Sequence, residues 1–538
     1  MTEGAVSGEV AAPQDGSQDG SGDTGRAGFS GGRWWIPIVA FLTTVGVQLA
    51  LMITAPPNAG LLILVLGVAA AVVFAGLRSP TFAIALLLVI SFFGLALRLT
   101  LPKIHLPVDP FVLAFMGVLG AAAVAITRRV NRLPRLGALE AVMVLYLTWN
   151  IGSALAPHSY PAMVPGTGED LSPWRFILTG AMAPFVLYVV GRFVFDRESA
   201  VRWLLWIVMG FFGYSIAVSI AEFYAPALVW PRYIVTAPDW EGRAVGVFNQ
   251  PVINGLLLVI GFVIALFLAS QPSEPQWRRA VAVVAAVAAI PAIYLTHSRI
   301  VWLVFALALI AGALWARNFR AGFVIALTGA VVVVAADWSA LLSSDRPTGG
   351  VTSTNEVDDR LNLAATAIAA IKEKPIAGWG ISRFIELNTY QHKQWAPGIN
   401  WSRGYSVAAQ HTELGITAEL GMIGLGLWLA VLVLLVRRLI VAVRALAVDR
   451  FCGRGLALVA IFAFAGWEIT GQTVDLRYFD FLNALVLLLA GIVVGWAERV
   501  PGAEQVSGAE RTPGSGQVPG SAITSGGGAG SGNRARKP

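Results

Sequence analysis

The segment from Glu413 to Val436, ELGITAELGMIGLGLWLAVLVLLV, decides the class of fold. As a helix rising about 1.5 Å per residue, it is long enough to cross about 30 Å of membrane hydrocarbon. Apolar runs of similar length, about 17 to 24 residues, recur about fourteen times along the chain. Short turns between some of them leave the count between about 12 and 14. The runs centre near Ala40, Val68, Leu87, Leu119, Leu145, Val186, Val208, Val259, Ala286, Ala306, Val331, Leu429, Ala460 and Leu487.

The composition points to the same class. Hydrophobic residues make up 56% of the chain, charged residues only 13%, and the mean hydropathy is +0.70. A water-soluble globule of this composition would have to bury almost every residue, which excludes that class. We therefore expect an all-α polytopic membrane protein with about 14 transmembrane helices, one large external loop containing short helices, and disordered termini.

The expected organisation has five parts. Residues 1–32 and 500–538 are rich in Gly and Ser and poor in apolar residues, which predicts disordered cytoplasmic tails. The first tail lacks the cleavage site of a signal peptide. Residues 33–336 hold the predicted transmembrane helices 1–11, residues 337–410 form the large external (periplasmic-side) loop, and residues 411–499 hold helices 12–14.

The arginines predict the orientation, because loops dense in Lys and Arg remain cytoplasmic. Alternation of the spans then places both termini in the cytoplasm and residues 337–410 outside. The predicted location is the cytoplasmic (inner) membrane, multi-pass, with any active site on the external face. An external loop of roughly seventy residues is far longer than an ordinary connector. The arginines that fix this orientation are Arg128, Arg129, Arg132 and Arg135 in one loop and Arg437, Arg438, Arg444, Arg450 and Arg454 in another.

The sequence excludes several kinds of chemistry. Cys452 is the only cysteine, so no internal disulfide forms, and no Cys/His cluster has the spacing of a zinc site. No phosphate-binding glycine loop is present. The net charge of +7 is explained by arginines beside the spans rather than by nucleic-acid binding. We expect no metal, no cofactor, no nucleotide and no nucleic acid.

The long loop has internal order. Asp358 and Asp359 are expected to cap the start of a helix that Pro375 stops. Such a helix lies on the bilayer surface or packs over the spans as a lid, and an Ala-rich stripe favours the lid. Gly378 and Gly380 predict a tight turn with close backbone approach. The predicted apolar stripe consists of Leu361, Leu363, Ala364, Ile368 and Ile371.

The external arginines oppose the orientation bias and need another reason to be there. Arg243 lies directly before a span, and Arg299 lies at a very short turn. A planar guanidinium binds two phosphate oxygens at once, so converging arginines predict a diphosphate clamp. The alternative is that each arginine reaches the lipid headgroups or pairs with a nearby acid, as Arg477 would with Asp475. Arg360, Arg403 and Arg477 would complete a possible ring of external arginines.

His411 stands at the start of the span described first. An imidazole accepts a proton from a hydroxyl near neutral pH, although a lone His beside a span is also explained as an ordinary interfacial side chain. Helical spacing places Gly415 and Glu419 on the same face as His411. Unpaired, Glu419 would cost about 2.5 to 3.5 kcal/mol in the bilayer, which predicts His411 or an arginine as its partner. Glu468 and Glu222 also lie near predicted spans, and each would likewise need a partner.

Taken in order, these elements resemble the signature region of the O-antigen ligase and O-antigen polymerase family, from Gly242 to Gly426. In that family Asn commonly follows the His, whereas Thr412 follows here and is expected to cap the helix. The matching elements are Arg243, Ser298-Arg299, His411 and the run Glu419-Leu420-Gly421-Met422-Ile423-Gly424.

The resemblance implies a metal-independent, inverting glycosyltransferase of cell-envelope polysaccharide synthesis. It would move a glycan from an undecaprenyl diphosphate carrier to an acceptor hydroxyl at the outer face of the membrane. Its partners would be a lipid-linked glycan donor, a glycan or lipid acceptor, and membrane lipids. The implied site has His411 as catalytic base, Arg243, Arg299, Arg360 and Arg477 at the diphosphate, and Glu419, Ser298, Asn249 and Glu468 in supporting roles.

Other functions stay open. A flippase for lipid-linked oligosaccharides would also need cations for a diphosphate, but in a cavity reachable from both sides. A peptidoglycan-type polymerase shares the general plan and differs mainly in its acceptor. A transferase using a polyprenyl monophosphate sugar typically has carboxylates in its first external loop, which residues 55–58 lack. Nothing in the sequence separates a ligase from a polymerase.

Overall fold

The computed structural model describes residues 79–100, 109–128, 135–164, 169–236, 240, 242–336, 355–390 and 408–500. All of them belong to one compact unit that begins at Val72. The predicted spans near Ala40 and Val68, both predicted tails and Arg403 lie outside the described residues.

The described chain is helical except for one antiparallel pair of two-residue strands, β1 (Met163–Val164) and β2 (Glu169–Asp170). Nine helices in these residues are long and apolar enough to cross a membrane. They are α5 (Pro110–Thr127), α6 (Ala138–Leu155), the continuous α7 (Pro173–Ile177), η1 (Leu178–Met182) and α8 (Ala183–Val194), α9 (Glu198–Tyr224), α11 (Pro251–Ala269), α12 (Gln276–Leu295), α18 (Thr412–Ala445), α19 (Arg454–Gly471) and α20 (Asp480–Glu498).

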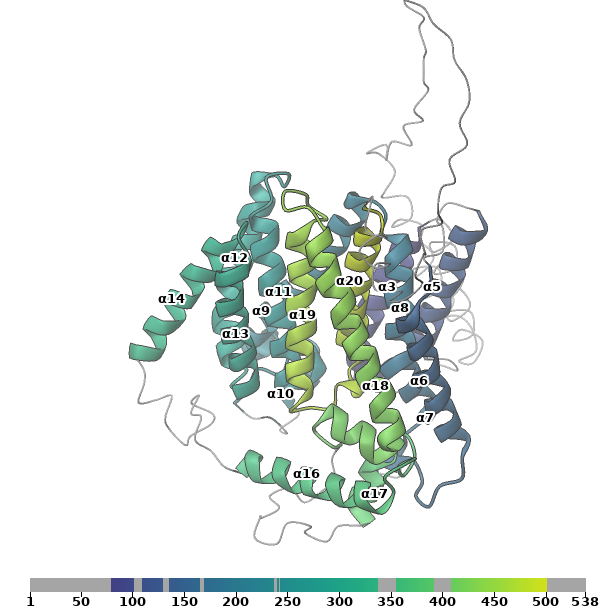
Figure 1. Ribbon diagram of the computed structural model, residues 1–538. Coiled ribbons are helices and arrows are strands. Elements are labelled where there is room, and N and C mark those ends of the chain that lie inside the picture. The colour runs from purple at the N-terminus through teal and green to yellow at the C-terminus, as the bar shows by residue number, and fades with distance from the viewer. Residues whose placement is uncertain are drawn as a thin grey trace, which may run out of the picture. The chain divides into compact units, whose positions relative to one another are not determined.

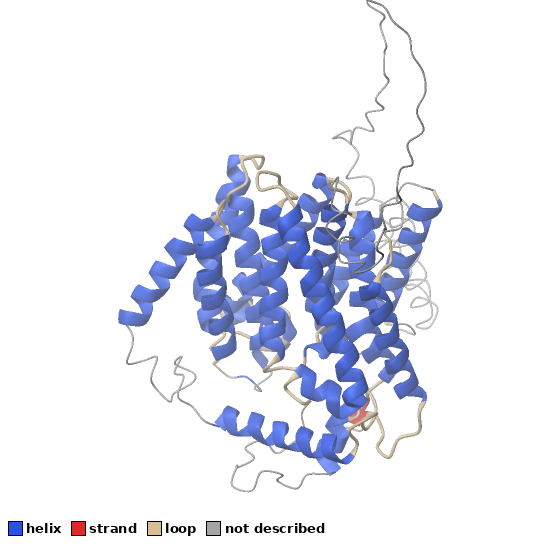
Figure 2. Cartoon of the chain, in the orientation of Figure 1, coloured by secondary structure: helices blue, strands red, loops and turns tan. Residues whose placement is uncertain are grey.

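Three further apolar helices are shorter: α3 (Pro80–Phe92), α13 (Arg299–Trp315) and α14 (Arg320–Ala336). Every predicted span from the one near Leu87 onward falls on one of these helices. Figure 2 shows how far helices dominate the described chain. The all-α, multi-pass membrane class is thereby confirmed. The total of about fourteen stays a prediction, because it includes two spans outside the described residues.

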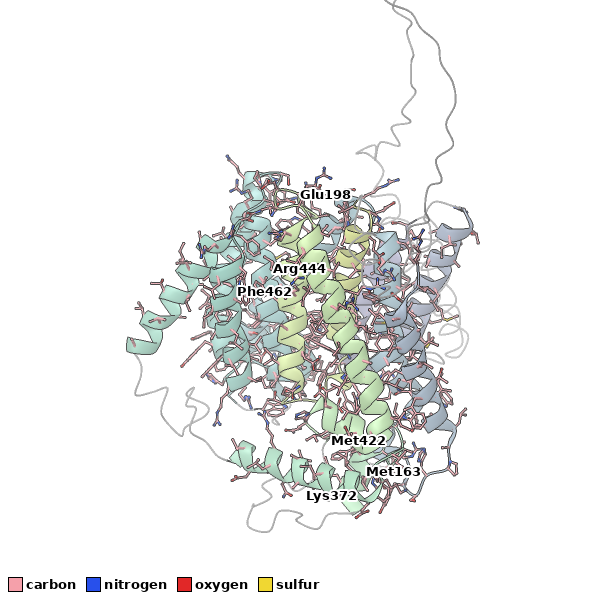
Figure 3. The ribbon with its side chains drawn as sticks, viewed as in Figure 1. Met163, Glu198, Lys372, Met422, Arg444 and Phe462 are labelled. Atoms are coloured by element: carbon pink, nitrogen blue, oxygen red, sulfur yellow. The ribbon has the colours of Figure 1, made fainter. Side chains whose placement is uncertain are left out.

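The remaining helices are short or lie beside the bundle. They are α4 (Gly94–Thr100), η2 (Pro226–Leu228), α10 (Tyr233–Thr236), η4 (Gly246–Phe248), α16 (Asn355–Glu373), α17 (Phe384–Tyr390) and η6 (Leu476–Tyr478). Figure 1 shows α16, α17 and α10 at one end of the bundle, which we call the α16 end. In Figure 3 Lys372 and Met163 lie at this end, whereas Glu198 lies at the opposite end. The predicted external and cytoplasmic loops are therefore separated, although the side that each end faces stays a prediction.

Two helices form the centre of the bundle. The apolar windows of α11 and α20 are each 89% buried. Helices in membranes pack closely where small residues let backbones approach. Gly491 of α20 shows this, because a Cβ at that position would lie 2.1 Å from the Tyr188 carbonyl oxygen of α8. By contrast, Val284 of α12 and Val331 of α14 are exposed, as lipid-facing side chains would be.

A buried ion cluster holds the opposite end together. The Arg192 guanidinium, on α8, pairs with Glu140 of α6 and, at 2.6 Å, with Glu498 of α20. Arg438 of α18 also contacts Glu498, at 2.9 Å. Since Arg192 is only 2% exposed, loss of one partner would leave an uncompensated charge. The cluster therefore links α6, α8, α18 and α20 to one another. These four helices carry much of the α16 end.

Helix α18 is kinked at Gly421, where φ is 68° and ψ is −171°. L side chains rarely adopt this conformation. A Cβ at Gly421 would also lie 2.0 Å from the Ile376 carbonyl oxygen. The kink separates a short first segment, Thr412–Leu420, from the long span, and this segment carries most of the candidate site on α18.

Candidate functional site

The loop that bears Arg243 contacts the turn that precedes Arg299. The Ala244 amide donates to the Leu295 carbonyl at 2.8 Å, and Arg243 Nε donates to the Thr296 carbonyl at 3.3 Å. His297 Nδ1 lies 2.7 Å from the Gly242 carbonyl oxygen. Two arginine motifs about fifty residues apart therefore meet at the α16 end, as a common site requires. The structure brings together the segments of Arg243 and Arg299 that the sequence predicted to converge.

Glu222 holds this loop in place. It lies in the last turn of α9, and its carboxylate accepts hydrogen bonds from the Val245 and Gly246 amides, both at 2.9 Å. Gly246 has φ +58°, and a Cβ there would lie 2.4 Å from Asn254 Oδ1. A carboxylate that accepts two backbone N–H groups fixes a loop at two adjacent residues. Glu222 therefore acts on the geometry of the Arg243 loop.

Asparagines complete the packing of the loop. Asn254 is fully buried on α11, and its amide donates to Ser219 Oγ at 2.8 Å and to the Ala244 carbonyl at 3.3 Å. Asn249, a predicted supporting residue, has the left-handed φ of 50° at the end of η4. Its Oδ1 is buried and has no hydrogen-bond partner among the described residues. Such an atom in a native fold calls for an explanation, and a ligand group is one.

The two arginines have different surroundings. Arg243 is only 6% exposed, and its guanidinium lies over the Trp240 ring, 5.0 Å from the centroid. Such stacking restrains the plane of a guanidinium. Arg299 is the first residue of α13, after the N-cap Ser298, which is buried. Arg299 thus begins α13 directly after the turn that the Arg243 loop contacts.

His411 is the N-cap of α18 and faces the aqueous end of the bundle, with its side chain 30% exposed. Its Nδ1 lies 3.4 Å from the Leu414 amide and 3.2 Å from Glu413 Oε2. The prediction that Thr412 caps the helix is wrong, because Thr412 is the first helical residue. Its hydroxyl instead donates to the Val474 carbonyl at 3.3 Å and accepts from the Leu476 amide at 3.2 Å. Thr412 thus ties the start of α18 to the turn after α19.

Glu419 forms an ion pair with an arginine, Arg477. Arg477 Nη1 lies 2.7 Å from Glu419 Oε2, and Glu419 is only 1% exposed. Arg477 also binds Asp475 through two contacts, Nη2–Oδ2 at 2.6 Å and Nε–Oδ1 at 2.9 Å. The predicted alternative of a Glu419–His411 pair does not occur, because Glu419 lies deeper in the helix beyond Gly415.

The three side chains form a buried cluster, which we call the Glu419–Arg477–Asp475 triad. Burial alone would lower the pKa of Arg477, but Asp475 and Glu419 outweigh it and hold that pKa well above its usual range. Gly415 makes room for the triad, because a Cβ there would lie 2.6 Å from Arg477 Nη2. For Arg477 the simpler interpretation, pairing with the nearby Asp475, is confirmed. Its predicted contact with a diphosphate stays untested.

The loop after α16 is fastened to the kink in α18. The Trp379 amide donates to the Ala418 carbonyl at 2.9 Å and the Gly380 amide to the Glu419 carbonyl at 2.8 Å. Gly378 has φ +72°, and a Cβ there would lie 2.4 Å from the Glu419 carbonyl carbon. The predicted tight turn with close backbone approach at Gly378 and Gly380 is confirmed.

The helix before that loop differs from its prediction in detail. α16 begins at Asn355, so Asp358 and Asp359 lie inside its first turns and the predicted cap is wrong. Leu361 and Ile368 of the predicted stripe are 50% and 45% exposed. Leu363 of the predicted stripe is buried, and the buried face also includes Ala367 and Ala370.

The reason is that the face of α16 that packs on α18 has small side chains beside Leu363, which leaves Leu361 and Ile368 on the outside. This packing is what the lid interpretation requires. Arg360 lies half-buried on α16 and therefore belongs to the helix that covers α18.

Helix α19 lies between the two halves of the site. Gly466 faces Val304 of α13 and Leu256 of α11, to which a Cβ would be 3.1 and 3.3 Å away. At the end of the same helix, Gly471 faces Thr412 of α18, 3.1 Å away. Arg243 and Arg299 thus lie beyond one side of α19, and His411 lies beyond the other, all at the α16 end.

Sequence reasoning missed two groups of residues. Glu413 was treated only as the beginning of a span, although a carboxylate two residues after a His is a visible signal for a partner. His158 and Arg383 were not singled out. Arg383 Nε donates to the Tyr160 carbonyl at 2.9 Å, and a Cβ at Gly380 would lie 2.5 Å from the His158 ring. Burial lowers the pKa of His158, and Arg383 and Lys374 lower it further.

The described helices define a multi-pass helical membrane protein with an arginine-bearing loop and a histidine-capped helix at one end. Residues 283–429 match the family model for O-antigen ligase. Over those residues the chain is similar to the O-antigen ligase family, and this similarity supports a membrane, glycan-transferring, ligase-like role. The match includes Ser298, Arg299 and His411, whereas Arg243 precedes it. A comparison with curated proteins gave no match.

Proposed function

We propose that this protein transfers a glycan from an undecaprenyl diphosphate carrier to an acceptor hydroxyl at the outer face of the cytoplasmic membrane. It would act as an O-antigen ligase-like or polymerase-like enzyme of cell-envelope polysaccharide synthesis. The observation that carries the proposal is the contact between the Arg243 loop and the turn that precedes Arg299. This contact gathers two arginines at the end of the bundle that also carries His411.

In the proposed reaction the acceptor oxygen attacks the anomeric carbon from the face opposite the diphosphate. The bond from that carbon to the diphosphate oxygen breaks, and inversion results. Arg243 and Arg299 stabilise the negative charge that grows on the leaving diphosphate, and Arg360 reaches it from α16. His411 accepts the proton of the acceptor hydroxyl. No metal or nucleotide is needed, because the carrier diphosphate is itself a good leaving group.

The other predicted residues have positioning roles in this proposal. Ser298 and Asn249 belong to the two segments that meet at the arginines. Glu419 holds Arg477, which is bound to two carboxylates, and the triad sets the position of the first segment of α18. We therefore give Arg477 a positioning role in place of the predicted diphosphate contact. Glu468 lies on α19, next to the His411 side of the site.

The test is glycan transfer by purified protein in liposomes that contain an undecaprenyl diphosphate oligosaccharide and candidate acceptors, with a chelator and no nucleotide. Arg243→Ala, Arg299→Ala and His411→Ala are each expected to lower turnover by about 10²-fold or more. Arg243→Lys should recover little, because an ammonium cannot bind two oxygens in one plane. Arg232→Ala is the matched control, since Arg232 is exposed at the same end and donates to the Pro226 and Ala227 carbonyls.

Two results would contradict the proposal. One is transfer that survives in all three variants. The other is movement of the lipid-linked glycan across the bilayer without bond cleavage, which would identify a flippase.

The proposed orientation has its own test. Single cysteines at the exposed positions Glu373 and Arg450 should react with a membrane-impermeant maleimide from opposite sides, Glu373→Cys from outside the cell. The native Cys452 will add little background, because burial raises the pKa of its thiol to about 12. Labelling of Arg450→Cys from outside would overturn the orientation.

A further inference from the structure

A pair of carboxylic acids lies directly behind His411. His411 Nδ1 is 3.2 Å from Glu413 Oε2, and Glu468 lies beside Glu413 on the neighbouring helix. Gln472 Nε2 donates to the same Glu413 oxygen, at 3.2 Å. Glu413 and His411 belong to the start of α18, whereas Glu468 and Gln472 lie on α19. The cluster therefore joins the two helices at the α16 end.

The neighbours of Glu413 bear on its charge state. An ionised carboxylate offers only acceptors, so it is matched by neighbours that can donate. Glu413 also faces the Gln472 amide, which is a donor at this contact. His411, Gln472 and Glu468 thus surround Glu413. The ionised form of Glu413 is the one that accepts hydrogen bonds from such neighbours.

The charge on Glu413 determines the tautomer of His411. Nδ1 cannot accept a hydrogen bond from the Leu414 amide and donate one to Glu413 at the same time. The Leu414 contact, at 3.4 Å, is long for an N–H···N bond. With Glu413 ionised, Nδ1 carries the proton and donates it to the carboxylate. Nε2 is then left unprotonated, with a lone pair available to a hydroxyl.

We propose that Glu413 is a positioning residue that holds His411 in the Nδ1–H tautomer. The inference rests on the proposed function of His411 as base. The acceptor hydroxyl gives its proton to Nε2 while its oxygen forms the new glycosidic bond and the diphosphate leaves with the electrons of the broken bond. The imidazolium that results is stabilised by Glu413, and its Nε2 proton then passes to water.

In the part of the chain that the structure describes, the other charged groups near His411 are bound to one another. Asp475 and Arg477, in the turn after α19, bind each other and Glu419. They lie beside Gly415, one turn along α18 from His411. The acids that face His411 directly from its own helix and from α19 are therefore Glu413 and, behind it, Glu468.

The direct test is the ¹⁵N NMR spectrum of the imidazoles in the ¹⁵N-histidine-labelled protein. The chain has five histidines, so the signals of His411 are identified by their loss in His411→Asn. We expect the Nδ1–H tautomer in the native protein. Glu413→Gln should convert it to Nε2–H, because the new amide donates to Nδ1. An Nε2–H tautomer in the native protein, or no change in Glu413→Gln, would overturn the inference.

Activity provides the second readout. Glu413→Gln is expected to lower kcat by about 10²-fold with little change in the KM for the donor, because the base is lost while the arginines remain. Glu413→Asp should restore part of the rate. Glu373→Gln is the matched control, since Glu373 is exposed at the same end. Glu413 would have a merely structural role if Glu413→Gln and Glu413→Asp lose activity equally and that loss follows the yield of folded protein.

The two proposals fail in different ways. If the native protein transfers no glycan from any donor, the proposed function fails, whereas the tautomer of His411 is still measured by NMR. If transfer occurs and depends on His411 but not on Glu413, the proposed function stands and the inference fails.

Discussion

Arg243 and Arg477 are both arginines of the α16 end, yet the fold uses them differently. Arg243 lies on a loop, donates to a backbone carbonyl and stacks on Trp240. Arg477 is locked between Asp475 and Glu419 in a buried triad. A guanidinium held by two carboxylates stabilises structure, whereas one presented by a loop is suited to bind a further anion. The positions of Arg243 and Arg477 in the sequence did not indicate which arginine has which role.

The largest effect should come from Arg477→Ala, which leaves two buried carboxylates without a cation. We expect a loss of about 3 to 5 kcal/mol of stability, seen as lower yield of folded protein and a lower Tm in detergent. Arg243→Ala should change Tm little and abolish transfer. Replacing the whole triad with neutral residues, as Arg477→Met, Glu419→Gln and Asp475→Asn, should recover part of the stability. Equal Tm shifts for Arg477→Ala and Arg243→Ala would remove the distinction.

Gly421→Ala should produce the next largest effect. It disturbs the kink that positions the first segment of α18, which carries Glu419 of the triad, without changing any charge. The positive φ and the contact with Ile376 predict a cost of about 2 kcal/mol or more, measured as Tm. Gly426→Ala is the control on the same helix, since a Cβ there meets nothing within 4 Å. If both variants melt alike, the kink does not hold the first segment of α18.

Glu222→Gln tests the arginine side. One amide oxygen remains to accept from the Val245 or Gly246 amide, but the charge that holds both is lost. We expect the KM for the lipid-linked donor to rise about tenfold, equivalent to about 1.4 kcal/mol, with Tm nearly unchanged. A fall in Tm with an unchanged KM would place Glu222 with the structural residues instead.

The smallest effect is expected for Thr412→Val, which removes the hydroxyl that joins α18 to the turn after α19. The loss of two hydrogen bonds predicts a cost of about 1 kcal/mol of stability, read as a modest fall in Tm. Thr417→Val should cost less, because the Thr417 hydroxyl donates only to its own helix, at the Glu413 carbonyl. A larger effect at Thr417 would contradict the role given to Thr412.

Sequence reasoning was most successful where one physical constraint dominates. The apolar runs predicted every described span, because a helix is how a chain satisfies its backbone in hydrocarbon. Gly378 and Gly380 predicted a close backbone approach, because little else fits there. The buried face of α16 was predicted only in part, since it depends on how Ala367 and Ala370 fit against α18. Periodicity shows that a helix is amphipathic, but the partner surface selects the face that is buried.

The sequence by itself determined that this is a multi-pass helical membrane protein, and its ordered motifs indicated the O-antigen ligase family. Both follow from local properties: the length of apolar runs and the residue types at fixed spacing. Only the tertiary structure decided which ionisable groups are partners, as with Glu419 and Arg477 or His411 and Glu413. The reason is that the energy of a charge in a membrane protein depends on its distance from another charge, and that distance is set by the packing of helices far apart in the chain.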